Sequence, residues 1–480
     1  MATTTVKPSV PVGEEVIHLS ALDQQAQRHY AKPLLFFELD HEGPNDPVLE
    51  HLKKSLSVAL SEAPDFASTV APLPGSTRKE LQLQLNPKSG ASWRVFDHTA
   101  EVNKGAWSYG SFQELAAKHF SLSDVPTELL VDSTLVDIPE DVQELPALSI
   151  QLNLIKGGII LAICWHHTVS DARGFNVLLN SWARHTKESM LRGEPDDAII
   201  PAEEARDRWR LDHGAANATI AQIPEYVVDA NARSPRSAAS LHLLDREDPL
   251  GAPFQISTWY LSSESLQSLR DSLGADGNSG AFTPVEAVSA LFWKHISRAR
   301  GLLDRSEEGA TSLFTTRLEF RARLLPPLSG DYIGNICEPN AHARLPLSEL
   351  CSPATGTSLA KVASAIRAAT EAVDDAAVRT YIGLINTLPA VTDLTWNYNG
   401  FPGPDFGVTD VSGLDICRTD WGPSLGAPVC LRLAYREGGL LYLFPIDPQG
   451  GLEVQALCEP DALEKLKADE GLAKFATFRG

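Results

Sequence analysis

A buried strand that leads almost directly into an amphipathic helix constrains the fold of this chain more than any other feature. Residues 148–155, LSIQLNLI, alternate apolar and polar side chains, and residues 159–165, IILAICW, are almost wholly apolar. With the Lys156–Gly158 turn between them, they predict a β-hairpin whose second strand is buried on both faces. The apolar spacing of GFNVLLNSWARHT, residues 174–186, then predicts a helix. Together these elements indicate a mixed α/β protein.

The turn between strand and helix reads HHTVSDARG, residues 166–174. A histidine held at a strand end can accept a proton near neutral pH, because the ordinary pKa of histidine is about 6.5. Asp171 could bond the ring or brace the turn from behind, and Gly174 could let backbone pass close to a ligand or adopt a positive φ. The same pattern also fits a hydrogen-bonded, half-buried strand end in which Asp171 is the N-cap of the helix. The local pattern leaves both interpretations open.

Similar patterns recur along the rest of the chain. We expect helices at 47–62, 282–300 and 358–373, and strands at 429–435 and 439–447. Periodicity weakens from about 193 to 255, where charged, proline and glycine residues are frequent. A chain of 480 residues is too long for one ordinary core. We therefore predict an N-terminal lobe at 1–195, a crossover linker at 196–255 and a C-terminal lobe at 256–480.

Charge and cysteine content exclude several classes of function. The net charge of -21 disfavours binding to nucleic acid or to an anionic membrane surface. The six cysteines show no CxxC and no paired spacing, which argues against a zinc site or a disulfide framework. The first residues lack an apolar signal sequence, and no apolar stretch is long enough to span a membrane. We therefore expect a soluble, cytoplasmic protein without a metal.

Five further segments occur in an order that matches a known family. These are LSALDQ and KPLLFFELD near the start, SALFWKHISRAR at 289–300, FRARLLPPLSGDYIGN at 320–335 and TDWGPSLGAP at 419–428. With HHTVSDARG, they resemble the HxxxD turn, the A-x-x-W helix, the R-x-R-L-x-P-P-L segment and the DFGWG signature of the BAHD acyltransferases. The resemblance spans about residues 17–460 and is strongest for the fungal branch around trichothecene 3-O-acetyltransferase. It implies two lobes like chloramphenicol acetyltransferase, each a mixed sheet with flanking helices, with an active-site channel between them.

The resemblance also implies roles for the residues of the turn. His167 would be the general base, and Asp171 would point away from the substrate and pair with an arginine, for which Arg321 is the candidate. Gly174 would leave room beside the pantetheine arm, although a plain turn glycine fits equally well. His166 is expected to be structural, because successive residues of an extended chain face opposite ways.

The second signature departs from the family pattern. Asp420, Trp421 and Gly422 stand for D-F-G, with Asp420 and Gly422 supporting the loop, but the family tryptophan and lysine are missing from 425–428, LGAP. This puts the local loop geometry in doubt more than the activity. The other DFG, at 405–407, lacks the accompanying kinase motifs, so we expect it to be structural.

No rival catalytic motif accompanies these segments. The chain has no G-x-S-x-G elbow, HExxH or GxGxxG, and Cys164 lies inside an apolar strand, where an inert thiol is expected. Lys294, Arg298 and Arg300 could contact the phosphates of CoA, or could be a solvated helix end. The residues that bind CoA stay unassigned.

The implied reaction is transfer of an acyl group, with acetyl expected, from acyl-CoA to a hydroxyl of a small specialised metabolite. A thioester is already activated, so one base suffices and no acyl-enzyme is needed. We expect a monomer that has these two small molecules as its partners. Two alternatives remain: a scaffold repurposed as a cyclase or other pericyclic enzyme, and a non-catalytic metabolite-binding protein.

Overall fold

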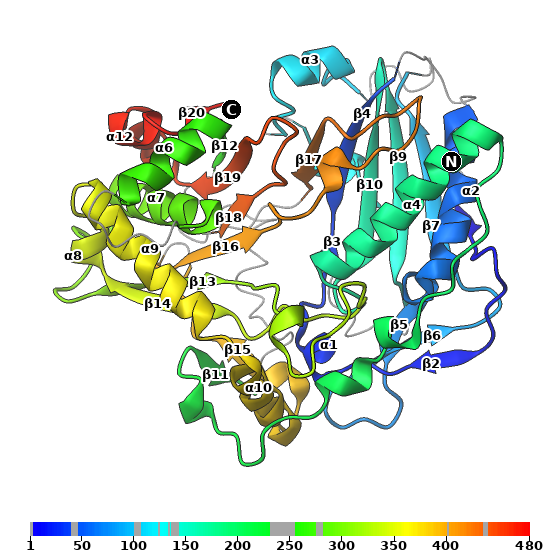
Figure 1. The fold of residues 1–480 in the computed structure, drawn as a ribbon, viewed down its shortest axis with the longest axis horizontal. Coiled ribbons are helices and arrows are strands. Elements are labelled where there is room, and N and C mark those ends of the chain that lie inside the picture. The colour runs from blue at the N-terminus through cyan, green and yellow to red at the C-terminus, as the bar shows by residue number, and fades with distance from the viewer. Residues whose placement is uncertain are drawn as a thin grey trace.

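The computed structural model describes residues 3–39, 47–99, 107–122, 125–132, 135, 144–230, 255–274, 282–400, 403–434 and 440–480. The first half of the chain, together with β17 from the second half, builds a seven-stranded sheet in the order β1-β7-β9-β10-β4-β17, with β3 paired to β10 (Figure 1). Its strands are β1 (Thr4–Val6), β7 (Ala91–Asp97), β9 (Leu148–Ile155), β10 (Gly158–His166), β4 (Pro33–Glu38), β17 (Cys430–Leu433) and β3 (Tyr30–Ala31).

The predicted hairpin and helix lie at the centre of this half. Strands β9 and β10 pair antiparallel, with Trp165 opposite Leu148, and every residue of β10 is buried. The polar positions of β9 are buried too: Gln151 donates to Leu129 O at 3.0 Å and Asn153 donates to Leu130 O at 2.9 Å. The polar residues of β9 therefore lie on one face of the strand, which the 125–132 segment covers and to which it is hydrogen-bonded.

Two long helices lie side by side along this sheet (Figure 1). They are α2 (Pro47–Glu62) and α4 (Ala172–Arg192). The Trp182 indole of α4 donates to Leu52 O of α2 at 2.8 Å, and both residues are buried. The apolar residues whose spacing predicts these helices thus form the face that packs against the core, as expected for amphipathic helices.

The second half builds another seven-stranded sheet, in the order β14-β13-β16-β18-β19-β12-β20. The β13/β16 and β16/β18 pairs are parallel and the others antiparallel, so the sheet is mixed. Its strands are β12 (Gln255–Leu261), β13 (Thr311–Thr316), β14 (Ala341–Pro346), β16 (Phe406–Asp410), β18 (Leu440–Leu443), β19 (Leu452–Cys458) and β20 (Thr477–Phe478).

Helices cover this second sheet, among them α7 and α9, which fall where the sequence predicts helices (Figure 1). The helices of this half are α6 (Ser263–Leu273), α7 (Pro284–Ala299), α8 (Leu347–Leu350), α9 (Gly356–Glu371), α10 (Asp375–Thr387), α11 (Pro460–Lys467) and α12 (Glu470–Ala473). Helix α7 begins with a capping box between Thr283 and Glu286, and its Trp293 is buried against Phe314 and Phe406 of the sheet. Each half therefore has a large hydrophobic core of its own.

Smaller elements lie beside the two large sheets. One four-stranded sheet contains β2 (Glu15–Ile17), β6 (Leu81–Leu85), β5 (Thr69–Pro72) and β8 (Leu145–Pro146), and β11 (Tyr226–Val228) pairs with β15 (Leu394–Trp396). The short helices α1 (Ala21–Gln25) and α3 (Phe112–Ala117) each begin with a capping box. Within the described ranges, no helix has the length and apolar character that a membrane crossing requires.

The second half contributes one strand to the first sheet. Within the predicted 429–435 strand, Cys430–Leu433 form β17, which pairs antiparallel with β4 of the first sheet, with Leu431 opposite Leu35. Much of the expected linker, 231–254, lies outside the described residues. The division into 1–195, 196–255 and 256–480 therefore stays a prediction, whereas the mixed α/β architecture is confirmed.

Candidate active site

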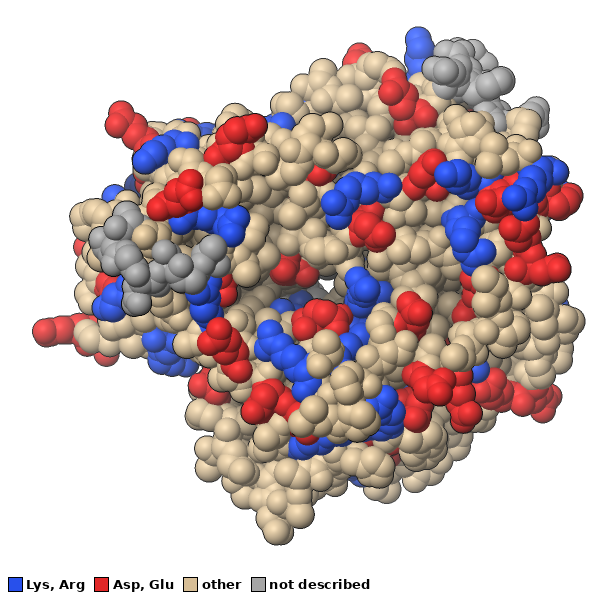
Figure 2. Space-filling model, viewed as in Figure 1, with Lys and Arg blue, Asp and Glu red and all other residues tan. Residues whose placement is uncertain are grey.

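A cavity of about 300 Å³ lies where the two large sheets meet. Its wall is made by the end of β10, the start of α4, the segment after β13, the end of β16, and strands β17 and β18. The space-filling view shows a hollow near the middle of this face of the molecule (Figure 2). We call this cavity, which contains His167 in its wall, the central pocket.

The two histidines of the turn face different surroundings. His167 lines the central pocket, and its backbone N–H donates to His29 O at 2.9 Å. His166 is fully buried, with its ring edge-on to Tyr30 at 5.2 Å between centroids. Burial lowers the pKa of His166 to about 3, with nearby positive charge acting in the same direction, so this ring is neutral. One histidine of the pair therefore lines the pocket, and the other is buried away from it.

The tautomer of the neutral His167 ring follows from its contact with Asn335. The Asn335 amide nitrogen faces three acceptors, Asp23 Oδ1 at 3.0 Å and the carbonyls of His167 and Thr168 at 3.0 and 3.1 Å. Its oxygen must therefore face the imidazole, and Oδ1 lies 3.2 Å from His167 Nδ1. An amide oxygen can only accept, so we assign the proton to Nδ1. Nε2 then carries the lone pair that a general base needs.

A buried chain of ionic contacts holds Asn335 in place. Asp23 Oδ1 also accepts the backbone N–H of Asn335 at 2.7 Å, and Asp23 Oδ2 lies 2.7 Å from Arg208 Nη1. Arg208 in turn pairs with Asp65 at 2.7 Å and donates to Val169 O at 2.9 Å. All of these side chains are buried. Sequence reasoning assigned none of them a role, although Asp23 and Asn335 lie in the segments LSALDQ and DYIGN that it singled out.

Asp171 is paired with Arg321, as expected. Arg321 Nη2 lies 2.9 Å from both carboxylate oxygens of Asp171 and also donates to Tyr332 O at 3.0 Å. The backbone N–H groups of Gly174 and Ile336 donate to Asp171 at 2.8 and 3.0 Å. Asp171 is therefore the N-cap of α4 and also the link between that helix and the 321–336 segment. The same carboxylate thus caps the helix and braces the turn. It touches the pocket wall, but its oxygens are occupied by these partners.

Gly174 is needed for contact between backbones. A Cβ atom at this position would lie 2.3 Å from Ile333 O and 2.4 Å from Ser170 Oγ. Its φ is not in the positive region. The structure thus gives Gly174 a role that the sequence did not anticipate, which is to let the start of α4 approach the 333–336 segment.

The second signature loop packs against the outer side of α4. Asp420 pairs with Lys187 at 2.9 Å and accepts the N–H of Gly422 at 2.9 Å, and Gly422 has a φ of +108°. Trp421 is fully buried, with its ring against Phe37 and Trp182. None of 419–422 lines the central pocket, which is consistent with a supporting loop.

Two of the three basic residues at the end of α7 make contacts inside the protein. Lys294 is buried and donates to Glu349 O at 2.7 Å, while Arg300 pairs with Glu459 at 3.0 Å. Burial lowers the pKa of Lys294 to about 8. Neither expectation, phosphate contact or a solvated helix end, describes these two residues. Arg298 is more exposed and lies 3.9 Å from Asp469.

Other candidate features are structural or lack reactive groups. Asp405 accepts the backbone N–H groups of Leu313 and Asn399 at 2.8 and 2.7 Å, so this DFG stabilises a loop. Cys164 is buried in β10. Among the described residues, no group of three or more His, Cys, Asp or Glu is placed to hold a metal ion.

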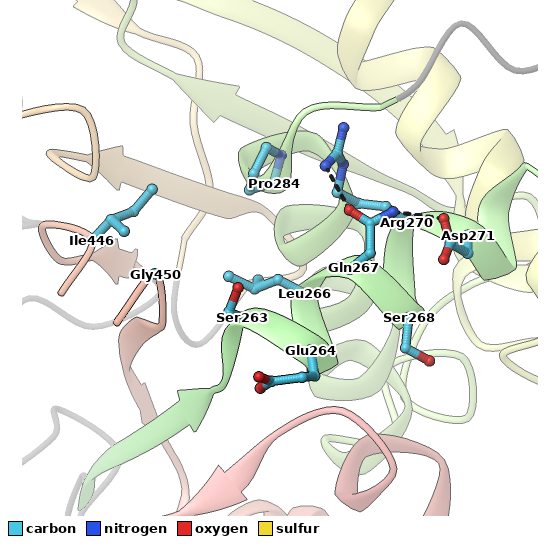
Figure 3. Close-up of a pocket in the computed structure, with 10 residues that line it drawn as sticks. All are labelled: Ser263, Glu264, Leu266, Gln267, Ser268, Arg270, Asp271, Pro284, Ile446 and Gly450. Atoms are coloured by element: carbon cyan, nitrogen blue, oxygen red, sulfur yellow. Dashed lines mark hydrogen bonds between the residues drawn. The ribbon is translucent and has the colours of Figure 1, made fainter. Parts of the chain in front are cut away.

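A second, more open pocket lies on the outer face of α6 (Figure 3). It is lined by Ser263, Glu264, Leu266, Gln267, Ser268, Arg270, Asp271, Pro284, Ile446 and Gly450. Within it, Gln267 donates to Asp271 at 2.7 Å and Arg270 donates to Gln267 at 3.3 Å. No histidine or cysteine lines it, so the central pocket is the better candidate for chemistry.

Comparison with known proteins agrees with this geometry. The sequence model of the Transferase family matches residues 1–472. The chain is 51% identical over 484 residues to Acyltransferase easC of Emericella nidulans, covering 100% of this chain and 98% of the relative. It is 47% identical over 485 residues to Acyltransferase cm3D of Cordyceps militaris, covering 100% of both. The crystal structure of F. graminearum TRI101 complexed with coenzyme A and T-2 mycotoxin matches with a TM-score of 0.76 at 17% identity, covering 97% of this chain and 100% of that chain. The structural match confirms the expected two-lobed fold.

Proposed function

The chain belongs to the Transferase family, and from that membership we propose that it is a CoA-dependent O-acyltransferase in which His167 is the general base. The observation that carries the base assignment is the Asn335 contact, which directs the lone pair of His167 to Nε2. The relatives at 51% and 47% identity are both acyltransferases, so an acyl-transferring enzyme is established on independent grounds. The TRI101 complex with coenzyme A supports acyl-CoA as the donor.

The chemistry needs one proton transfer in each direction. Nε2 of His167 removes the hydroxyl proton of the acceptor as its oxygen attacks the thioester carbonyl, which forms a tetrahedral intermediate. Collapse of that intermediate breaks the carbon–sulfur bond, and the departing CoA sulfur takes the proton back from His167. The products are the ester and free CoA, and the enzyme returns to its starting state. No covalent acyl-enzyme is formed.

The surroundings of His167 support this role. Asn335 holds the ring in one tautomer, and its position is fixed by the buried Asp23 carboxylate. Asp171 and Arg321 fix the turn from behind through their ion pair and through the Gly174 N–H that Asp171 accepts. Such second contacts reduce the motion of a base, and correct positioning contributes much of the rate of acyl transfer.

Finer features of the function are also part of the proposal. By resemblance to the fungal acetyltransferase branch, we propose acetyl-CoA as the donor and a small specialised metabolite as the acceptor. The net charge of -21 supports small-molecule partners over nucleic acid. We further propose a monomer that works in the cytoplasm.

Release of free thiol from acetyl-CoA in the presence of candidate alcohols tests the proposal. His167→Ala should lower this release by about 10²-fold or more, because general-base catalysis contributes on that order. His213→Ala is the matched control, since His213 is exposed and does not line the central pocket. Unchanged release in His167→Ala would contradict the base assignment. Conversion of a ligand without any CoA would favour a cyclase.

A further inference from the structure

Arg317 places a positive charge in the wall of the central pocket. It directly follows β13 and lines the same cavity as His167. Its side chain is partly buried, and the guanidinium carbon lies 5.7 Å from the centre of the Trp396 ring. Nη1 donates to Thr409 Oγ1 at 3.2 Å, and Nη2 makes a long contact of 3.5 Å with Gln27 Oε1. These contacts orient the guanidinium without neutralising it.

Comparison with Arg321, four residues later, shows what Arg317 lacks. Arg321 has carboxylates at 2.9 Å (Asp171) and at 2.7 Å (Glu319). Arg317 makes no ion pair within 4.0 Å with any acidic residue that the structure describes, and both of its side-chain acceptors are neutral. A guanidinium has five N–H donors, and charge-assisted bonds to carboxylates are the strongest that it forms. Most of this capacity is unused by the described protein groups.

The acidic side chains in the pocket wall are held by other groups. Glu319 is bonded to Arg321, and Asp410 accepts the backbone N–H of Ser412 at 2.9 Å. The Asp410 side chain is open to the cavity, yet it lies deep in the molecule, and burial raises its pKa. Neither Glu319 nor Asp410 forms an ion pair with Arg317.

The rest of the wall is mainly apolar. It includes Trp165, Phe175, Leu318, Ile336, Leu431 and Leu433. An apolar pocket with a few placed polar groups favours a ligand with an apolar body and a matching polar end. At Arg317 the matching group is a single planar anion, since a guanidinium binds a carboxylate through two parallel bonds.

We propose that Arg317 forms a carboxylate-binding subsite of the central pocket, so that one of the two substrates carries a carboxylate on an apolar body. The identity of that ligand as a substrate rests on the proposed function. The existence of the subsite does not rest on the proposed function, because the protein can bind a carboxylate there without any reaction. Arg317 would then select the substrate by charge, while His167 acts on the hydroxyl.

Calorimetric titration of the full-length protein with octanoate and with octanamide tests the subsite. The two probes share shape and apolar area but differ in charge. We expect octanoate to bind the wild type at least about tenfold more tightly than octanamide, as a hydrogen-bonded charge pair allows. Arg317→Gln should remove this preference with little change for octanamide, and Arg317→Lys should retain part of it. Arg344→Gln should behave as wild type, because Arg344 is exposed and likewise donates to a threonine hydroxyl, that of Thr311.

Several outcomes would overturn the subsite. These are equal affinity of the two probes for the wild type, failure of both to bind, or an octanoate preference that survives in a folded Arg317→Gln. Equal loss of both probes in Arg317→Gln and Arg317→Lys would make Arg317 structural. Displacement of octanoate by adenosine 3′,5′-bisphosphate, with Arg317→Gln weakening both, would assign the site to the phosphates of CoA instead. Absence of thiol release from acyl-CoA would refute the proposed function and leave the binding result intact.

Discussion

Replacing Asp171 with asparagine removes one negative charge from the turn while keeping the shape of the side chain. The carboxylate receives Arg321 at 2.9 Å on both oxygens and the backbone N–H groups of Gly174 and Ile336. An asparagine oxygen can still accept the Gly174 N–H and cap α4. Its amide nitrogen would instead face two donors, Arg321 and the Ile336 N–H, and could bond neither. The substitution thus removes the ion pair and keeps the helix cap, so that the contribution of the ion pair can be measured by itself.

The size of the effect follows from the burial of this pair. Asp171 and Arg321 have side-chain exposures of 8% and 4%. Removing one partner of a buried pair costs about 3 to 5 kcal/mol of unfolding free energy, because the other charge stays buried. Arg321 keeps Glu319, but that carboxylate is 51% exposed and compensates the charge only weakly. We therefore expect a loss of about 3 kcal/mol for Asp171→Asn, and about 1 kcal/mol more for Asp171→Ala, which also loses the cap.

Urea unfolding followed by tryptophan fluorescence measures this loss. Trp165 and Trp182 lie on either side of the turn and are buried, so they report on the first half. Glu319→Gln is the matched control, and because Glu319 is half exposed we expect it to cost at most about 1 kcal/mol. At low temperature, the folded Asp171→Asn enzyme should retain thiol release within about tenfold of wild type. Wild-type stability combined with lost activity would refute the bracing role and place Asp171 in the chemistry.

Three further changes test the contacts of the turn and of helix α4. Asn335→Ala removes the acceptor that places the proton on His167 Nδ1, so kcat should fall about tenfold to a hundredfold with KM nearly unchanged, in a pH–rate profile measured from pH 5 to 9. Gly174→Ala places a Cβ atom 2.3 Å from Ile333 O, and the required backbone shift should lower the urea midpoint by the equivalent of about 1 to 3 kcal/mol. Burial tends to raise the pKa of Glu62, but its hydrogen bonds outweigh burial and lower the pKa from 4.5 to about 2. As the pH falls, the unfolded chain therefore binds this proton before the folded protein does. The stability that Glu62 contributes is present above pH 4.5 and is lost as the pH falls toward 2. In Glu62→Gln, the melting temperature should therefore depend less on pH over that range.

The elements that the sequence predicted are those with strong local patterns. The hairpin, α4 and the cap at Asp171 depend on residues within a few positions of each other, and all were found. Periodicity cannot say which distant strand pairs with which, so the pairing of β17 with β4 was not anticipated. Burial of Lys294 was also missed, because its partner is a backbone carbonyl 55 residues away.

The site shows the same division between local and distant information. His167 stands out in the sequence because two histidines end an apolar strand. Asn335, which fixes the tautomer of the ring, lies 168 residues further along the chain, in the 320–335 segment that was singled out only by its resemblance to the family. Arg321 was inferred as the partner of Asp171 by resemblance, since no spacing rule connects residues 150 positions apart. Physical reasoning on the sequence alone therefore points to a histidine as a candidate base, but not to the contacts around it.

These distant contacts also explain why the proposed base requires both halves of the molecule. His167 ends a strand of the first sheet, whereas Asn335 and Arg321 belong to the segment between β13 and β14 of the second. If the halves moved apart, Nδ1 would lose its acceptor and Asp171 would lose its charge partner at the same time. The pairing of β17 with β4 opposes such motion, because it would break main-chain hydrogen bonds across the junction. By holding the two halves together, the β17/β4 pairing thus preserves the Asn335 contact and the His167 tautomer on which the proposed proton transfer depends.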